Sequence, residues 1–114
     1  CTVLVNGQPT RSCITLAVQA RTCEVDTVEG LGEDQELDPL QAAFIDNRAF
    51  QCGFCTPGML MALRPLWDSA ERVTEDTVRQ AICGNVCRCT GYQPIVRAAL
   101  DAFSSGGRHG GKKP

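Results

Sequence analysis

Two short segments of the sequence each contain a close pair of cysteines. The first pair is Cys52 and Cys55, and the second is Cys87 and Cys89. Thiolates at such spacings bind metal ions or iron–sulfur clusters in proteins of reducing compartments. The spacing favours an iron–sulfur site. Structural zinc and disulfides remain alternatives, although zinc usually takes paired ligands two to four residues apart, and Cys87 and Cys89 lie closer than that.

Each cysteine pair lies in a loop just before an expected helix. The free N–H groups and partial positive charge of a helix N-terminus stabilise anions such as thiolate and sulfide. Gly53 and Gly91 lie within or next to the pairs, and we expect them to take the positive φ angles that let the backbone turn closely around a cluster.

The helical pattern begins at Asp38 and predicts four short helices that form a bundle. Asp38 caps the first helix, Thr56 caps the second and Thr74 caps the third, which runs through Ile82, while Pro94 starts the fourth. Pro65 lies inside the second pattern and should bend or end that helix. The residues expected in the core recur at helical spacing: Leu40, Ala43, Phe44, Met59, Leu60, Leu63, Leu66, Trp67, Ile95, Ala98, Ala99, Ala102 and Phe103.

The N-terminal part has a β-type pattern. Thr2–Val5 and Gln8–Arg11 flank Asn6-Gly7, a typical hairpin turn, and Cys23–Val28 is a candidate third strand. Cys13–Ala20 is apolar and fits either a strand or a helix. So few short strands do not make a stable sheet alone, and the chain opens on Cys1 rather than Met. We therefore expect that an upstream segment is missing.

Composition and charge exclude several classes of protein. No apolar run reaches the ~20 residues of a membrane span, and a net charge of −2 with a pI near 5.3 gives no case for nucleic-acid binding. No basic start precedes an apolar stretch, so we expect a cytoplasmic protein. Seven acids between Glu24 and Asp38 predict a solvated loop, with a docking surface as the alternative. Residues 104–114, which include His109, have the composition of a disordered tail.

The cysteine motifs closely resemble those of a known family. Gln-Cys-Gly-Phe-Cys-Thr-Pro-Gly-Met at 51–59, followed by Gly-Asn-Val-Cys-Arg-Cys-Thr-Gly-Tyr at 84–92, resembles the small iron–sulfur subunit of the molybdenum hydroxylases, the xanthine oxidase family. The resemblance runs from Cys1 to about Phe103. It implies an α+β fold in which residues 38–103 form a four-helix [2Fe–2S] domain and residues 29–37 an acidic connection. Residues 1–28 would be the remnant of a β-grasp, plant-type ferredoxin module.

The resemblance also implies roles for individual residues. Cys52, Cys55, Cys87 and Cys89 would ligate the [2Fe–2S] cluster of the helical domain, with Gln51 and Cys89 on the molybdopterin side. Cys1 and Cys13 match the third and fourth ligands of a second, plant-type cluster, which this chain completes only if upstream ligands exist. Cys23 and Cys83 match no ligand, and we expect both to be small buried residues.

By the same resemblance, the chain would conduct electrons from a large molybdopterin-binding subunit towards a medium FAD-binding subunit or another acceptor. The substrate would bind elsewhere. Arg88 lies between two ligands, where its charge would raise the cluster potential unless it pairs with an acidic neighbour. The alternative from another class is a zinc-stabilised interaction module without redox function, docking through its acidic loop.

Overall fold

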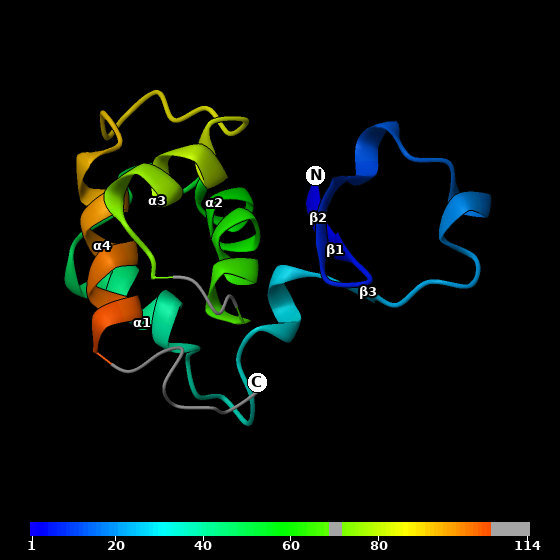
Figure 1. Ribbon diagram of the computed structural model, residues 1–114, viewed down its shortest axis with the longest axis horizontal. Helices are drawn as coiled ribbons and strands as arrows, with labels where there is room; N and C mark the ends of the chain where they lie inside the picture. The colour runs from blue at the N-terminus through cyan, green and yellow to red at the C-terminus, as the bar shows by residue number, and fades with distance from the viewer. Residues whose placement is uncertain (69–71, 106–114) are drawn as a thin grey trace.

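The computed structural model describes residues 1–68 and 72–105, arranged as a small β unit beside a group of helices (Figure 1). His109 and most of the expected tail lie outside these residues. The α-helices are α1 (Pro39–Asp46), α2 (Thr56–Leu63), α3 (Glu75–Ile82) and α4 (Gln93–Ser104), and the strands are β1 (Thr2–Val5), β2 (Gln8–Arg11) and β3 (Val25–Asp26). Short 3-10 helices lie at η1 (Ser12–Ile14), η2 (Ala17–Ala20), η3 (Val28–Gly30) and η4 (Arg64–Asp68).

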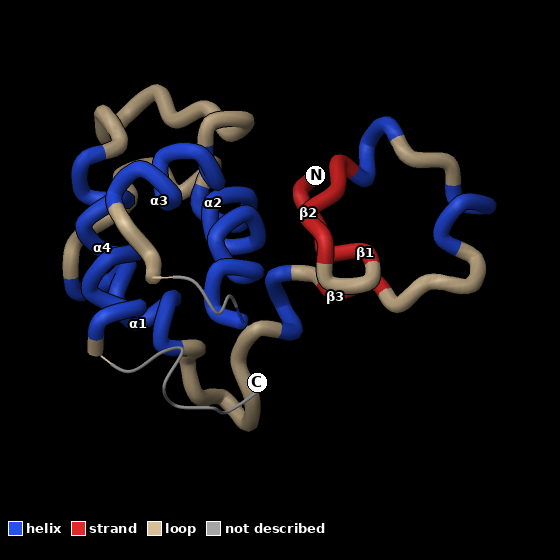
Figure 2. Tube along the Cα trace, viewed as in Figure 1, coloured by secondary structure: helices blue, strands red, loops and turns tan. Residues whose placement is uncertain are grey.

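The predicted hairpin is confirmed. β1 pairs antiparallel with β2, from Thr2 opposite Arg11 to Val5 opposite Gln8. Asn6 and Gly7 have φ angles of 50° and 80°, as a two-residue hairpin turn requires. The central strand β1 also pairs with β3, so the order in the sheet is β2-β1-β3 (Figure 2).

The third strand is shorter than the expected Cys23–Val28. Only Val25 and Asp26 pair with β1, because the Cys23 amide is held in a turn by the Ala20 carbonyl and η3 begins at Val28. The ambiguous stretch at Cys13–Ala20 is neither strand nor α-helix but contains the end of η1 and the whole of η2. The segment that contains η1 and η2 lies on the side of the β unit away from the four helices (Figure 1).

Side-chain caps set the starts of α1 and α3. The Asp38 carboxylate accepts the Leu40 amide at 2.8 Å, and the Gln41 side chain accepts the Asp38 amide at 2.9 Å, which together form a capping box. The Thr74 hydroxyl accepts the Thr77 amide at 3.3 Å and caps α3. At its C-terminal end, α2 stops at Leu63 and the chain continues as the 3-10 helix η4, as expected from Pro65.

The expected cap of α2 at Thr56 is wrong by one residue. Cys55 is the N-cap, and Thr56 is the first residue of the helix. The cause is local: the Cys55 carbonyl already accepts the Met59 amide at 3.0 Å, while the Thr56 amide is bonded to the Gly53 carbonyl at 3.2 Å. The cysteine itself therefore marks the junction between loop and helix.

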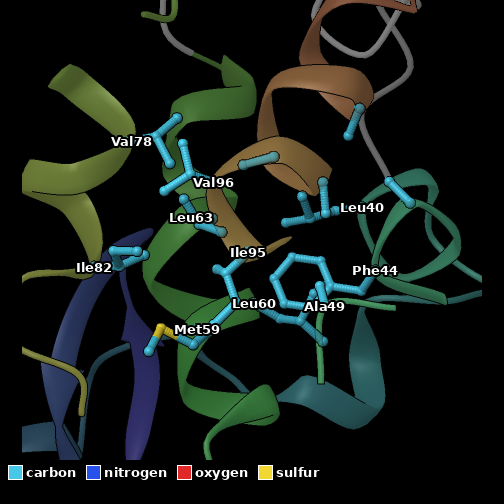
Figure 3. Close-up of a cluster of buried hydrophobic side chains, with 14 of the residues drawn as sticks. Leu40, Phe44, Ala49, Met59, Leu60, Leu63, Val78, Ile82, Ile95 and Val96 are labelled. Atoms are coloured by element: carbon cyan, nitrogen blue, oxygen red, sulfur yellow. The ribbon is translucent and has the colours of Figure 1, made fainter. Parts of the chain in front are cut away.

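The core lies among the four helices. Leu40 and Phe44 of α1 point toward Ile95 of α4, and Leu60 and Leu63 of α2 close the cluster (Figure 3). All five side chains are buried, which confirms the predicted faces, and Leu66 is half-buried against the same core. The Trp67 ring packs on Phe103 with 5.6 Å between the ring centroids. Both aromatic side chains are buried in the core.

One member of the acidic segment is not solvated. Asp38 is buried, and its carboxylate lies 3.8 Å from the Arg64 guanidinium, which in turn stacks over the Trp67 ring at 5.1 Å. The other six acids are exposed, as expected: Glu24, Asp26, Glu29, Glu33, Asp34 and Glu36. The buried pair links the start of α1 to the end of α2.

Candidate metal centre

The fold brings the two cysteine loops together. The Gln51 side chain of the first loop donates to the Cys89 carbonyl of the second at 3.2 Å. Cys55 and Cys87 lie close enough for each thiol to affect the pKa of the other. Each loop leads into a helix, α2 after Cys55 and α4 after Tyr92, as predicted. Four sulfur donors therefore lie on two adjacent loops at helix N-termini.

The four thiols differ in exposure. Cys87 is buried and Cys55 is half-buried, whereas Cys52 and Cys89 are exposed. Gly53 and Gly91 have φ angles of 81° and 68°, which confirms their expected conformation. A group bound by all four sulfurs would thus have a protein-facing side and a solvent-facing side.

Hydrogen bonds to sulfur prepare the loops for anionic ligands. The Phe54 amide donates to Cys52 Sγ at 3.5 Å, and the Thr90 amide donates to Cys87 Sγ at 3.4 Å. The Thr90 hydroxyl is a further 3.0 Å partner of Cys87 Sγ. Hydrogen bonds of this kind stabilise a thiolate and tune the potential of a bound metal.

These contacts act differently on the two inner thiols. Burial works to raise the pKa of Cys87, but the hydrogen bonds from the Thr90 side chain and backbone outweigh it and lower the pKa to about 7. Burial, together with the interaction with Cys87, raises the pKa of Cys55 to about 11. Without metal, Cys87 is therefore the member of this pair that ionises first.

Thr90 and Tyr92 are site residues that the sequence reasoning missed. The Thr90 hydroxyl accepts the Tyr92 amide at 3.1 Å, and the Tyr92 hydroxyl accepts the Cys87 amide at 3.1 Å. Tyr92 has a φ of 71°, unusual for a non-glycine residue, and this reversal folds its ring back over the loop. The sequence feature that could have indicated this arrangement is Thr90 two residues before Tyr92. This is the spacing of a turn in which a threonine hydroxyl accepts a backbone amide two residues further on.

The type and pairing of the donors fit a [2Fe–2S] cluster. Within residues 1–68 and 72–105, no three His, Cys, Asp or Glu side chains already converge on a single point. A [2Fe–2S] cluster takes four thiolates, two at each iron, so two separate cysteine pairs fit it. All eight cysteines lie in the described ranges, and each is a free thiol.

The remaining cysteines have different surroundings. Cys1 and Cys13 are both exposed, and the Cys1 carbonyl accepts the Ser12 amide at 2.8 Å, so their backbones are neighbours. The expectation that Cys83 is buried is wrong: it is the exposed C-terminal cap of α3. Cys23 is only half-buried, because it lies in an exposed turn where its thiol contacts the Gln19 carbonyl at 3.6 Å.

Arg88 is exposed between Cys87 and Cys89, and Gln51 is exposed beside Cys89. Among the described residues, Arg88 forms no ion pair. Within the described ranges, a salt bridge with an acidic neighbour therefore does not account for Arg88. Its charge remains available to the site or to a partner.

Comparison with known proteins identifies the family. Residues 27–100 match the [2Fe-2S] binding domain family. The chain is 58% identical over 105 residues to the 6-hydroxypseudooxynicotine dehydrogenase complex subunit beta of Paenarthrobacter nicotinovorans, covering 90% of this chain and 65% of that protein. It is 50% identical over 102 residues to the nicotine 6-hydroxylase small subunit of the same organism, covering 90% and 61%. The chain thus spans less than two thirds of the length of either relative.

Comparison with solved structures indicates the same family. Quinoline 2-oxidoreductase from Pseudomonas putida 86 matches with a TM-score of 0.89 and 47% identity, covering 96% of this chain and 68% of that one. Aldehyde oxidoreductase from Desulfovibrio desulfuricans matches with a TM-score of 0.83 and 40% identity, covering 92% and 12%.

The chain is a [2Fe-2S] binding protein with an α+β fold, as predicted. It belongs to the family of small iron–sulfur subunits of molybdenum hydroxylases, which confirms the resemblance drawn from its motifs. In the described part of the chain, no helix combines the length and the apolar character needed to cross a membrane.

Proposed function

We propose that this chain is the electron-transfer subunit of a multi-subunit molybdenum hydroxylase or dehydrogenase. Cys52, Cys55, Cys87 and Cys89 hold its [2Fe–2S] cluster. The observation that carries this proposal is the meeting of the two cysteine loops, where Gln51 bonds to the Cys89 carbonyl and each of the Cys55 and Cys87 thiols affects the pKa of the other. When bound, such a cluster accepts and releases single electrons.

The protein's own contribution is to hold the sulfurs and control their surroundings. The Thr90 amide donates to the sulfur of the buried Cys87, and the Thr90 hydroxyl is a further partner of that sulfur. The Phe54 amide donates to the sulfur of the exposed Cys52. The helix N-termini of α2 and α4 add partial positive charge, which favours thiolates and raises a cluster's potential. Cys89 and Gln51, both exposed, form the edge that we assign to the molybdopterin side.

We infer that the partners are a large molybdopterin-binding subunit and a medium FAD-binding subunit or another electron acceptor, working in the cytoplasm. Two large apolar side chains flank the cysteines and lie in solvent: Phe54 is 92% exposed and Val86 is 80% exposed. Such residues suit a protein interface. In the aldehyde oxidoreductase, the part that matches this chain is only 12% of a much longer polypeptide.

Residues 1–28 belong, on this proposal, to a plant-type ferredoxin module, with residues 29–37 as an acidic connection to the helical domain at 38–103. Cys1 and Cys13 would then be two ligands of a second cluster whose other ligands lie upstream. The contact between Cys1 and Ser12 supports this by bringing the two cysteines near each other.

Metal analysis and spectroscopy test the cluster. We expect the purified protein to contain iron and acid-labile sulfide, and to show visible absorption that dithionite bleaches. Cys52→Ser and Cys87→Ser should each abolish one reduced-state EPR signal. The matched control Cys83→Ser, which replaces an exposed cysteine outside the four, should retain it. A colourless protein that binds one zinc per chain would favour the zinc module and refute the proposal.

The docking surface is tested by truncating the exposed apolar side chains beside the cysteines, with an exposed valine elsewhere as the control. Val86 lies beside Cys87, whereas Val18, which is 66% exposed, belongs to η2 on the far side of the β unit (Figure 1). Val86→Ala combined with Phe54→Ala should weaken copurification with the large subunit and leave the EPR signal intact, while Val18→Ala should leave copurification unchanged. Equal recovery of the large subunit with all variants would contradict this interface.

A further inference from the structure

A polar network connects the β unit to the second cysteine loop. The Arg11 guanidinium at the end of β2 donates through Nη2 to the Gly84 carbonyl at 2.8 Å and to Asn85 Oδ1 at 3.3 Å. Its Nη1 donates to the hydroxyl of Thr2. The Asn85 amide group completes a triangle by donating to the same Thr2 hydroxyl at 3.3 Å. Arg11 and Asn85 are separated by 74 residues in sequence.

The network is closely packed. Thr2 is buried, and Arg11 and Asn85 are half-buried. A Cβ atom on Gly84 would lie 2.6 Å from Arg11 Nη2, so only glycine lets the guanidinium approach this carbonyl without displacement. On the other side, a Cβ atom on Gly58 of α2 would lie 2.7 Å from Asn85 Nδ2. Asn85 is thus held between the β unit and the helix that follows the first cysteine pair.

The chemistry of Arg11 suits this position. A guanidinium presents several N–H donors in a rigid planar fork and can hold two acceptors at fixed angles, which a single lysine ammonium does less well. Here one arm binds the β unit through Thr2 and the other binds the loop that starts three residues before Cys87.

We propose that Arg11 is a positioning residue for the second cysteine loop: with Thr2 and Asn85 it fixes residues 84–89 against the β unit and so determines where the Cys87 and Cys89 sulfurs stand. The function of those sulfurs as cluster ligands rests on the proposed function above. The positioning of the loop does not, and it can be measured separately.

Hydrogen exchange in the native holoprotein measures the position of the loop directly. The Asn85 and Cys87 amides are internally bonded, to the Ile82 carbonyl and the Tyr92 hydroxyl, so their exchange reports loop opening. In Arg11→Gln we expect about tenfold faster exchange at these amides, the factor that loss of a charge-assisted hydrogen bond produces. Arg11→Lys should lie between wild type and Arg11→Gln, since it keeps the charge but not the fork.

Two further variants make the result specific. Arg21→Gln removes an exposed arginine from the same β unit and should leave exchange in residues 84–89 unchanged. Thr2→Val keeps the shape and removes the shared hydroxyl, so it should accelerate exchange without unfolding the strand even if Arg11→Gln is poorly folded. Wild-type exchange at Asn85 and Cys87 in both Arg11→Gln and Thr2→Val would overturn the proposal.

The EPR spectrum separates this proposal from the function on which it builds. The signal that Cys52→Ser abolishes should broaden or shift in Arg11→Gln but not in Arg21→Gln, because the sulfur positions change. If the wild-type protein lacks any such signal, the cluster assignment fails, and the exchange rates still decide the role of Arg11. If the signal is unchanged in Arg11→Gln and exchange at Asn85 and Cys87 is unchanged in both Arg11→Gln and Thr2→Val, the positioning role is refuted and the cluster assignment stands.

Discussion

The Gln51 side chain and the Cys89 carbonyl are joined by a 3.2 Å hydrogen bond that spans 38 residues of sequence. It connects the residue just before the first cysteine pair with the last cysteine of the second pair. Both partners are exposed, so the bond lies at the surface of the site rather than in its interior. Gln51 therefore links the two loops at the edge that we assign to the molybdopterin side.

Loss of this bond should loosen the loops without unfolding the protein. For Gln51→Leu we expect a stability loss of about 0.5–1 kcal/mol, the lower part of the range for a neutral hydrogen bond because this one is exposed. Chelators should remove iron severalfold faster. Denaturant unfolding and iron-release kinetics measure the two effects. Gln80→Leu on the exposed face of α3 is the control. Equal rates of iron release from the two variants would contradict a role of the Gln51–Cys89 hydrogen bond in holding the loops together.

Arg88 should raise the potential of a cluster bound beside it. The guanidinium is exposed and unpaired among the described residues, and its positive charge favours the reduced, more negative cluster. Arg88→Gln should therefore lower the midpoint potential in a redox titration of the holoprotein. Arg97→Gln, an exposed arginine on α4, should shift it less. Identical midpoints for Arg88→Gln and wild type would show that the charge is screened by solvent.

Removal of Asp38 should destabilise the protein strongly, because it leaves Arg64 buried without its counter-charge. Asp38→Ala removes both the cap of α1 and the partner of a buried guanidinium. We expect a loss of about 3–5 kcal/mol, as when one member of a buried pair is left without its counter-charge. Thermal or denaturant unfolding measures it. Glu33→Ala, in the same acidic segment but exposed, should stay within about 0.5 kcal/mol of wild type.

Gly58 and Asn85 should be energetically coupled. An alanine inside a helix gains about 1 kcal/mol over glycine, but the new Cβ would displace the Asn85 side chain and break hydrogen bonds of similar individual worth. Gly58→Ala should therefore be neutral or destabilising in the wild-type background and stabilising in an Asn85→Ala background. A double-mutant cycle measures the difference. An equal effect in the two backgrounds would rule out the contact.

Features specified by neighbouring residues could be predicted from the sequence. The hairpin follows from Asn6-Gly7, and the starts of α1 and α3 follow from Asp38 and Thr74, because each motif satisfies its own backbone groups. The position of each cysteine pair just before a helix N-terminus could be predicted for the same reason. The start of α2 differed by one residue because the Gly53 carbonyl, rather than the Thr56 side chain, determines the local bonding.

Features set by distant parts of the chain could not be predicted in this way. Nothing local to Arg11 indicates that it reaches Gly84, and nothing local to Asp38 indicates its burial against Arg64. Cysteine's general preference for the interior gave the wrong exposure for Cys83, because a helix end facing solvent overrides a residue-type average. Such features depend on how the elements pack, which the pattern of one segment does not contain.

The packing of α1 against α4 affects the order of events during biosynthesis. These helices are the first and the last of the bundle in sequence, yet they lie side by side and share the core around Phe44 and Ile95 (Figures 1 and 3). On a ribosome, the first cysteine pair emerges well before residues 93–104, and α1 cannot yet find its partner. The nascent chain therefore presents two reactive thiols without the pair that completes the set. The helix bundle that supports both cysteine loops can therefore close only after α4 has been synthesised.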